Sequence, residues 1–318
     1  MARAFVTGAA GFIGSNLVDH LLENGWTVVA YDNLSTGMLD FLSSAKAYPK
    51  FSFVRGDVLD VELLAESMSG ADIVFHLSAN ADVRFGTLHP RRDLDQNTIA
   101  TFNVLEAMRK SGIKDIVFSS TGSVYGDAKV VPTPENGPFP IQTSLYGASK
   151  VACEGLITSY CEGFDFRSFI FRFVSVLGER YTHGHVFDFY KRLRQDPTHL
   201  HILGDGRQRK SYMYVKDCVE AITLAMGKST DKINVYNLGV DGYAEVNQSV
   251  AWITGRLGLS PTLTYAGGER GWVGDSPFIY LDTSRIRALG WEPKVGIQAA
   301  VLRTVDWLQT NEYVLERP

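Results

Sequence analysis

Tyr146 and Lys150, four positions apart in the stretch SLYGASK, could together exchange a proton with a hydroxyl group. Residues i and i+4 share one face of a helix, and a helix is predicted over residues 144–163. A free phenol titrates near pH ~10, but a cation within about 4–6 Å favours the phenolate and lowers its pKa. Alone, such a pair is usually a surface feature. The hydroxyl-rich stretch FSSTGSVYG (118–126) ends a predicted strand, where ligands of open α/β sheets bind, so we expect proton exchange with a sugar or alcohol hydroxyl.

A glycine-rich turn near the N-terminus has the spacing of a dinucleotide-binding turn. Gly8, Gly11 and Gly14 in VTGAAGFIGSNL stand between a predicted strand (3–7) and a predicted helix (13–23). Such glycines permit a tight turn, close approach of a pyrophosphate, and packing of the helix on the strand. Asp32 ends the next predicted strand at about the ~20-residue distance expected for the residue that holds the adenosine ribose. A carboxylate there would repel a 2′-phosphate, so the pattern predicts NAD rather than NADP; the alternative is a glycine turn that binds nothing.

Strands and helices alternate through the first half of the chain. Short β-branched and aromatic runs predict strands over 3–7, 27–32, 51–57, 72–78, 115–121 and 166–173. Helical patterns between them cover 13–23, 60–68, 92–110 and 144–163. Continuous apolar strands are buried on both faces, which is typical of a parallel sheet. The order therefore predicts a doubly wound α/β fold of the Rossmann type with right-handed crossovers.

The second half is less regular. Helices are predicted over 185–195, 216–227, 246–257 and 296–309, and strands over 200–206 and 233–239. No proline-rich or charge-rich linker separates the halves, so we expect two closely packed lobes with the chain crossing between them. Residues 1–173 plus about 215–240 would form the dinucleotide-binding domain. Residues of about 174–214 plus 241–318 would form a smaller α/β lobe.

Composition excludes several classes of protein. The chain has 318 residues, a net charge of −4 spread along it, and 45% hydrophobic residues, without a basic footprint for nucleic acid. No apolar run reaches the roughly 18–20 residues of a membrane span, and the N-terminal stretch lacks the pattern of a signal peptide. The odd number of cysteines, without CxxC spacing, favours a reducing cytoplasm. Two HxH pairs, at 183–185 and 199–201, lack further ligands, so we expect no metal site.

Over nearly its whole length the chain resembles the extended short-chain dehydrogenases/reductases of the NAD-dependent sugar-nucleotide epimerase and dehydratase family. The resemblance rests on GAAGFIG, YDNLSTG, GDV, HLSA, DQNTIATFNVLEA, SSTGSVYG, YGASK and GDGRQRKSYMYVKD. Within the family the chain is most similar to UDP-glucose 4-epimerases. The resemblance implies NAD as cofactor, a UDP-sugar as substrate held mainly by the smaller lobe, and a homodimer that pairs helices like 97–110 and 144–163.

The resemblance also implies which residues hold the cofactor. The first turn would bind the pyrophosphate through Gly8, Gly11, Phe12, Ile13 and Gly14. Asp32 and Asn33 would hold the adenosine ribose, and Asp57 and Val58 would lie beside the adenine. Near the phosphate would be Ser35, Thr36 and Gly37. Leu77, Ser78 and Ala79 would lie beneath the cofactor, and Asn97 would face it. Beside the nicotinamide and its ribose would be Tyr146, Lys150 and Phe173.

For catalysis the resemblance implies Tyr146 as the base, Lys150 on the nicotinamide ribose, and Thr121 as donor to the reacting sugar oxygen. The substrate-binding residues would be Thr121, Ser175, His185, Arg209, Lys210 and Arg270. Three positions depart from the family pattern. Ser175 stands where an Asn is usual, Lys210 replaces a phosphate-binding Arg, and extra residues separate Arg270 from the Gly-Asp pair that normally follows it closely. His185 would lie in the loop that closes over the nucleotide.

These features together lead us to expect NAD-dependent 4-epimerisation of UDP-glucose or UDP-galactose through a 4-keto intermediate. In SSTGSVYG, Gly122 and Ser123 occupy the positions where 4,6-dehydratases of the family have an Asp and a Glu. Other nucleotide-sugar epimerases, acting on UDP-N-acetylhexosamines or UDP-uronates, remain open alternatives. A dehydratase, a decarboxylase or a non-catalytic dinucleotide sensor agrees less well with the sequence.

Overall fold

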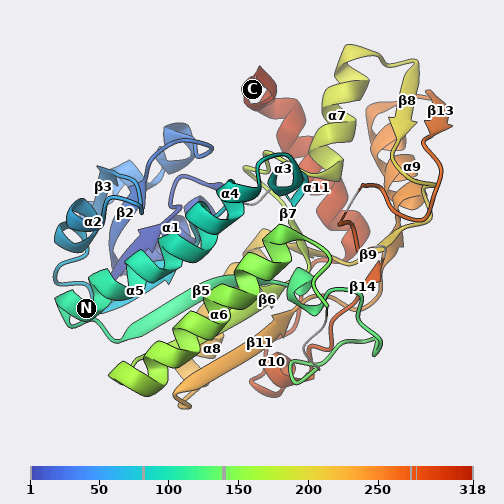
Figure 1. The fold of residues 1–318 in the computed structure, drawn as a ribbon. Helices are drawn as coiled ribbons and strands as arrows, with labels where there is room; N and C mark the ends of the chain where they lie inside the picture. The colour runs from blue at the N-terminus through green and yellow to red at the C-terminus, as the bar shows by residue number, and fades with distance from the viewer. Residues whose placement is uncertain (1, 81–82, 138–140, 273, 277, 317–318) are drawn as a thin grey trace.

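A parallel sheet of seven strands forms the centre of the computed structural model, which describes residues 2–80, 83–137, 141–272, 274–276 and 278–316. The strand order is β11-β6-β5-β4-β1-β2-β3, and every neighbouring pair is parallel (Figure 1). The strands are β1 (Arg3–Thr7), β2 (Thr27–Asp32), β3 (Phe51–Arg55), β4 (Ile73–His76), β5 (Asp115–Thr121), β6 (Arg167–Phe173) and β11 (Ile233–Leu238). This order confirms the predicted doubly wound α/β fold.

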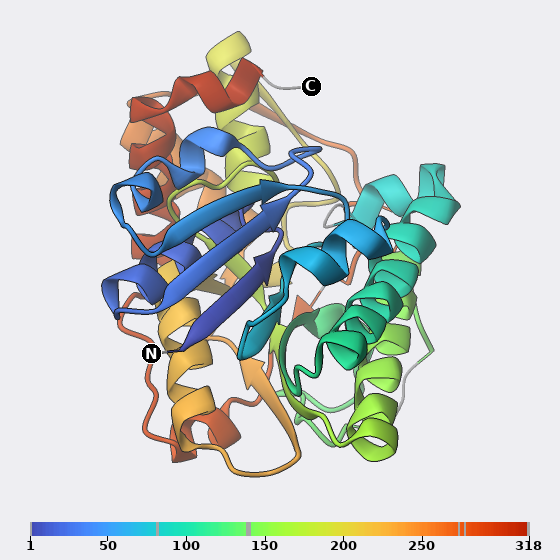
Figure 2. The same cartoon turned by 90° about the vertical axis from the view of Figure 1, so that its left-hand side faces the viewer.

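Helices cover both faces of the sheet. On one side lie α1 (Phe12–Glu23) and α8 (Val215–Lys228); on the other lie α2 (Val61–Ser67), α5 (Ala100–Ser111) and α6 (Leu145–Phe164) (Figure 2). Alternate residues of β1 enter different cores, since Ala4 and Val6 pack with α1 whereas Phe5 packs with α5. The continuous apolar strands are therefore buried on both faces, as the sequence predicts.

The helix predicted over 92–110 is divided in the structure. It consists of α4 (Pro90–Asp93), a π-helical turn η3 (Leu94–Ile99) and α5, preceded by α3 (Val83–Leu88). A π turn holds an extra residue per turn, and single π turns are frequent at functional sites. Hydrophobic periodicity does not reveal such an insertion, so the sequence predicts one continuous helix here.

The remaining elements gather beyond the carboxyl ends of the sheet strands. The helices there are α7 (His185–Gln195), α9 (Val246–Leu257) and α11 (Ile297–Thr310), whereas α10 (Ser284–Ala288) packs beside the edge strand β11. Short strands pair as β7 (Ser175–Leu177) with β10 (Tyr212–Tyr214), β8 (His199–Ile202) with β13 (Thr262–Tyr265), and β9 (Arg209–Lys210) with both β12 (Ala244–Glu245) and β14 (Phe278–Ile279). Strands of two or three residues are too short for a periodic pattern, and only β8 was predicted.

The C-terminal part of the chain returns to the edge of the sheet. A Cβ atom placed on Gly122, in the turn η4 (Gly122–Tyr125) after β5, would lie 3.0 Å from Ile279 Cγ2 and 3.2 Å from the carbonyl oxygen of Phe173. The β14 segment thus packs directly over the ends of β5 and β6.

In the described parts of the chain, no helix is both long and apolar enough to span a membrane.

Candidate active site

The three glycines of the first turn have three different surroundings. Gly8 has φ +66°, and a Cβ atom there would lie 2.7 Å from the backbone nitrogen of Ser78. A Cβ atom on Gly14 would lie 2.1 Å from the Gly8 carbonyl oxygen. A Cβ atom on Gly11 would lie 3.2 Å from the same Gly8 carbonyl oxygen. Apart from the two residues next to Gly11 in the chain, it would meet no other described atom within 4 Å. Gly8 therefore makes the turn, Gly14 allows helix packing, and Gly11 leaves the space above the turn open.

Helix α1 begins at this open space. Gly11 occupies the N-cap position and offers no side chain to the first amide groups of the helix. The first turn, from Phe12 to Ser15, contains no acidic residue. Free amides and the positive end of the helix dipole suit an anion such as a pyrophosphate. Phe12 meets Tyr181 edge to face at 5.4 Å, and Ile13 is partly buried beside it.

Asp32 lies at the carboxyl end of β2 with 8% of its surface exposed. Its carboxylate accepts hydrogen bonds from the backbone nitrogens of Ala10 (2.9 Å) and Leu34 (2.8 Å). Burial raises the pKa of Asp32, and the two backbone hydrogen bonds oppose that rise. A Cβ atom on Gly37 would lie 2.9 Å from Asp32 Oδ1, so the loop after β2 wraps closely around the carboxylate.

The other residues expected near adenosine lie beside Asp32. Asn33 Nδ2 donates to Asp57 Oδ2 at 2.9 Å, and Asn33 Oδ1 accepts from the backbone nitrogen of Ser35 at 2.9 Å. Ser35 and the following Thr36 are exposed. The carbonyl oxygen of Val58 accepts from Asn103 at 3.1 Å. The ends of β2 and β3 thus bring these predicted residues together.

Beneath the glycine turn runs a buried polar chain that the sequence alone did not indicate. His76 contacts Thr7 Oγ1 through Nδ1 (2.9 Å) and Thr101 Oγ1 through Nε2 (3.0 Å). Burial, with a smaller effect of the Lys150 charge, lowers the pKa of His76 to about 3, so the imidazole is neutral. Ser78 Oγ donates to Thr7 Oγ1 at 3.0 Å, while Leu77 and Ala79 are partly buried on either side.

Asn97, in the π turn, connects the end of β4 to helix α6. Its Oδ1 accepts from the backbone nitrogen of Asn80 at 2.9 Å, and its Nδ2 donates to Ser149 Oγ at 2.8 Å. Ser149 Oγ in turn donates to the carbonyl oxygen of Tyr146 at 2.8 Å. Sequence reasoning missed Asn80 and Ser149. Asn80 directly follows the HLSA motif, and Ser149 lies inside YGASK.

The three residues expected to be catalytic meet where β5 ends. Thr121 is the last residue of β5 and is paired in register with Phe173 of β6. Its Oγ1 accepts from the backbone nitrogen of Ser123 at 3.1 Å. Lys150 Nζ donates to the carbonyl oxygen of Ser119 at 2.8 Å. The side chain of Thr121 also acts on the Tyr146 phenol, opposing the rise in its pKa that burial causes, so the phenol belongs to the same place.

Both ionisable groups of the Tyr–Lys pair respond mainly to burial. The Lys150 side chain is 2% exposed, and burial lowers its pKa to about 8, against the opposing charges of Glu154 and Asp93. Burial raises the pKa of Tyr146, and the contact with Thr121 opposes that rise. The lowering of the Tyr146 pKa by Lys150 expected from the sequence is absent here. Lys150 Nζ lies 6.0 Å from the Tyr146 ring centroid and is directed at Ser119 instead.

A second cluster forms around a buried carboxylate, Asp275. Lys210 Nζ contacts Asp275 Oδ1 at 2.6 Å and also donates to the carbonyl oxygen of Ser276. Arg270 donates to the carbonyl oxygen of Asp275, and the backbone nitrogen of Gly271 donates to Asp275 Oδ2 at 3.0 Å. Asp275 was noted in the sequence only as part of the Gly-Asp pair. In the structure it fixes the positions of Lys210 and Arg270, two of the three predicted cations.

His185 and Ser175 lie next to this cluster. The His185 ring stacks on Tyr212 with centroids 4.5 Å apart, and its Nε2 contacts Ser249 Oγ at 2.8 Å. Burial and the charge of Lys210 lower the pKa of His185 to about 3, which makes the ring neutral. Ser175 is exposed and pairs in register with Tyr212.

Arg209 does not join Lys210. Neighbouring residues of a strand point to opposite faces. The Arg209 guanidinium lies 4.1 Å above the Phe278 ring centroid and 5.4 Å from that of Tyr243, away from Asp275. The structure therefore separates two cations that the sequence predicted would act together.

The Asp275 cluster is held close to Tyr146. A Cβ atom on Gly274, which has φ +88°, would lie 3.1 Å from the carbonyl oxygen of Thr143 and 3.2 Å from Ser144 Cβ, just before α6. Arg270 also pairs with Asp127 at 2.7 Å, immediately after the FSSTGSVYG stretch. The described residues contain no group of three or more His, Cys, Asp or Glu side chains arranged to hold a metal ion.

Known proteins resemble the chain over its whole length. The model of the NAD dependent epimerase/dehydratase family matches residues 4–239. A UDP-glucose 4-epimerase of Mycolicibacterium smegmatis is 34% identical and covers 97% of this chain and 99% of its own length. A crystal structure of a UDP-galactose 4-epimerase superposes with a TM-score of 0.88 at 37% identity, covering 97% of this chain and 99% of its own. A UDP-glucuronic acid 4-epimerase from Bacillus cereus, solved with UDP-glucuronic acid and NAD, gives a TM-score of 0.89 at 27% identity, covering 97% and 99%. Fold, site geometry and these similarities agree that the chain belongs to the NAD-dependent epimerase/dehydratase family of nucleotide-sugar enzymes.

Proposed function

We propose that the protein catalyses the 4-epimerisation of UDP-glucose and UDP-galactose through a 4-keto intermediate. The observation that carries this proposal is the convergence of Thr121 and Tyr146 at a strand end that lacks the acidic groups of a dehydratase. The relatives named UDP-glucose 4-epimerase and UDP-galactose 4-epimerase support it.

The first turn and the Asp32 loop fit NAD, the cofactor of the family. Gly11 leaves room for the pyrophosphate, the N-terminus of α1 faces it, and Asp32 presents a carboxylate to the adenosine ribose. When bound, NAD supplies the hydride acceptor and donor for carbon 4 of the sugar.

Tyr146 and Thr121 handle the 4-oxygen of the sugar. The backbone nitrogen of Ser123 donates to Thr121 Oγ1, which itself donates to Ser123 Oγ over an oxygen–oxygen distance of 3.3 Å. Thr121 would give this proton to the sugar oxygen instead. Tyr146 Oη then removes the proton of the 4-hydroxyl and later returns it. With its pKa near 8, Lys150 is protonated at neutral pH and keeps a cation one helical turn from the phenol.

Elimination of water from the 4-keto sugar would need an acid for the 6-hydroxyl and a base for carbon 5. Carboxyl groups of separated pKa values suit these two tasks. Gly122 has no side chain, and a Cβ atom there would crowd Ile279 and the carbonyl oxygen of Phe173. Ser123 offers only a hydroxyl, so the site favours epimerisation over dehydration.

The Asp275 cluster is the proposed site for the diphosphate of UDP. Lys210 and Arg270 are fixed around Asp275, beside the N-terminus of α6, and His185 and Ser175 lie nearby. A dinucleotide sensor would need no base. The Tyr–Lys pair, with a cofactor site and the Asp275 cluster beside it, therefore favours an enzyme over a sensor. Similarity to the B. cereus UDP-glucuronic acid 4-epimerase keeps a UDP-uronate as the second candidate substrate. Similarity to a UDP-N-acetylglucosamine 4-epimerase from Methanobrevibacter ruminantium keeps a UDP-N-acetylhexosamine as the third.

We further propose that residues 1–173 plus 215–240 bind NAD and that 174–214 plus 241–318 bind the UDP-sugar. A homodimer through α5 and α6 is supported by the exposed apolar side chains Ile99, Phe102 and Leu145 in this region. The three cysteines are free and buried, which suits a reducing cytoplasm.

The substrate proposal is tested by incubating the purified protein with a panel of UDP-sugars and resolving 4-epimers by chromatography. We expect UDP-glucose and UDP-galactose to interconvert and no 4-keto-6-deoxy sugar to form from any nucleotide-glucose. Such keto sugars absorb strongly in alkali. An alkaline absorbance that grows with turnover would contradict the proposed reaction, and turnover confined to uronates would replace the substrate.

Cofactor selectivity should depend on Asp32. We expect the wild type to bind NAD at least about tenfold more tightly than NADP, which corresponds to about 1.4 kcal/mol, because the carboxylate repels a 2′-phosphate. Asp32→Asn keeps the side-chain size and should narrow the difference. Titration of cofactor-free protein measures both affinities, and equal wild-type affinities would refute the assignment.

Tyr146→Phe should lose about 10²–10⁴-fold in kcat while retaining bound NAD, because general acid–base catalysis contributes about that much. Acid extraction measures the retained cofactor, and steady-state assays measure kcat. A kcat within about tenfold of the wild-type value would be too small a loss for a general base, and it would exclude Tyr146 from that role.

The separation of Lys210 and Arg209 yields a paired prediction. Lys210→Gln should raise KM for the UDP-sugar about tenfold to a hundredfold, with a smaller effect on kcat, because a charge-assisted contact of about 1.5–3 kcal/mol is lost. Arg209→Gln removes the neighbouring cation from the opposite face and should change KM less. An equal rise in both variants would show that Arg209 also reaches the diphosphate.

A further inference from the structure

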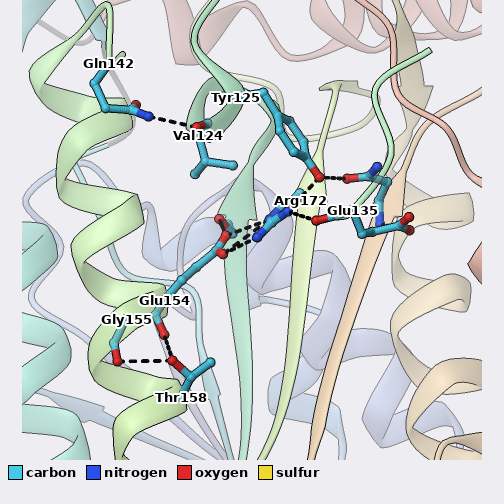
Figure 3. A network of polar contacts seen from close by, with 10 residues as sticks. Val124, Tyr125, Glu135, Gln142, Glu154, Gly155, Thr158 and Arg172 are labelled. Carbon is cyan, nitrogen blue, oxygen red and sulfur yellow. Dashed lines mark hydrogen bonds and ion pairs between the residues drawn. The ribbon is translucent and has the colours of Figure 1, made fainter. Parts of the chain in front are cut away.

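Glu154 lies on α6 one helical turn beyond Lys150 and two beyond Tyr146. Its carboxylate accepts from Ser120 Oγ at 2.5 Å. It also accepts both arms of the Arg172 guanidinium, from Nε at 3.0 Å and from Nη2 at 2.6 Å (Figure 3). The side chains of Arg172 and Glu154 are only 15% and 12% exposed. One carboxylate therefore joins α6 to both β5 and β6 inside the protein.

The two residues that Glu154 joins are themselves register partners. Ser120 of β5 pairs with Arg172 of β6, and the next pair along the strands is Thr121 with Phe173. Side chains alternate between the faces of a sheet, so Ser120 and Arg172 both face α6. Glu154 thus fixes the strand pair one residue before the position where Thr121 leaves β5.

Lys150 holds the preceding residue of the same strand, through its hydrogen bond to the carbonyl oxygen of Ser119. Helix α6 is therefore hydrogen-bonded to β5 at two consecutive residues, 119 and 120, directly before Thr121. The same helix carries Tyr146. The relative position of the Tyr146 phenol and the Thr121 hydroxyl consequently depends on these two contacts.

The far side of the guanidinium fixes the network to the rest of the sheet edge. Arg172 Nη1 donates to Tyr125 Oη at 2.7 Å and to the carbonyl oxygen of Glu135 at 2.9 Å (Figure 3). Tyr125 Oη donates to Asn237 Oδ1 at 2.8 Å, at the end of β11. Arg172 is therefore held from several directions and provides a rigid partner for Glu154.

We propose that Glu154 is a positioning residue that sets the distance between the Thr121 hydroxyl and the Tyr146 phenol. It acts through Ser120 and Arg172 and does not touch the sugar. The inference rests on the proposed function, which gives Thr121 and Tyr146 their roles. The simpler alternative is a buried ion pair that only stabilises the fold.

Ser120→Ala and Glu154→Gln separate the two explanations. A displacement of about 1 Å between reacting groups costs about 10²-fold in rate, so we expect Glu154→Gln to lower kcat about tenfold to a hundredfold. Ser120→Ala removes one hydroxyl, leaves the ion pair intact, and should lower kcat less. In both variants we expect KM for the UDP-sugar, cofactor content and Tm to match those of a control variant, Asp19→Asn.

Asp19→Asn is the matched control. Asp19 pairs with Arg180 at 2.6 Å, with side chains 20% and 18% exposed, and within the described residues the hydrogen bonds of both side chains are to each other and to Ser44. If Glu154→Gln merely breaks a buried ion pair, it should lower Tm as the control does and change kcat no more than the control.

Crystal structures of the two variants supply a readout that does not depend on the substrate. We expect the distance between Thr121 Oγ1 and Tyr146 Oη to change in Glu154→Gln and to remain as in the wild type in Asp19→Asn. An unchanged distance, or a kcat within about twofold of wild type, would overturn the positioning role. A wild type inactive on every sugar would refute the proposed function instead, and the measured distance would still decide the role of Glu154.

Discussion

The parallel direction of the strands is the constraint on which the rest of this structure depends. All seven carboxyl ends meet at one edge of the sheet, so residues far apart in the chain become neighbours there. Gly8 follows β1, Asp32 ends β2, Ser78 follows β4, Thr121 ends β5 and Phe173 ends β6. Each residue is placed by the end of a rigid strand rather than by a loop. Small displacements of the loops therefore have little effect on the relative positions of these groups.

That arrangement requires polar groups to be buried at the edge, and the structure stabilises each of them with specific partners. Lys150 is nearly inaccessible yet donates to the Ser119 carbonyl oxygen, and its lowered pKa reflects the cost of removing the ammonium from water. His76 avoids that cost because it is neutral, with a hydroxyl group at each ring nitrogen. Glu154 and Arg172 neutralise each other, and a buried pair of this kind becomes costly when one partner is removed.

Much of this arrangement could be predicted from the sequence because it depends on local patterns. The glycine spacing, the alternation of apolar strands and helices, and the Tyr–Lys spacing each follow from the geometry of a single element. The π turn at 94–99 could not be predicted, because its extra residue leaves the hydrophobic pattern looking helical. The Asn97–Ser149 and Glu154–Ser120 contacts join residues 52 and 34 positions apart, which no local pattern records. The raised pKa of Tyr146 is not visible in the sequence for a related reason, since burial and the direction of the Lys150 side chain are tertiary properties.

The Asp275 cluster shows how a two-residue strand can determine which cation meets a ligand. In the sequence, Arg209 and Lys210 look equivalent, but the alternation of a β-strand sends one to the Phe278 ring and the other to Asp275. Lys210 has three N–H donors and uses two of them, on Asp275 and the Ser276 carbonyl oxygen. Asp275 and Asp127 also balance the charges of Lys210 and Arg270. If the cluster binds the diphosphate as proposed, the attraction would come less from net positive charge than from donors already fixed in place. The exposed Arg270–Asp127 pair, weakened by solvent, is the contact that would most readily be exchanged for a phosphate oxygen.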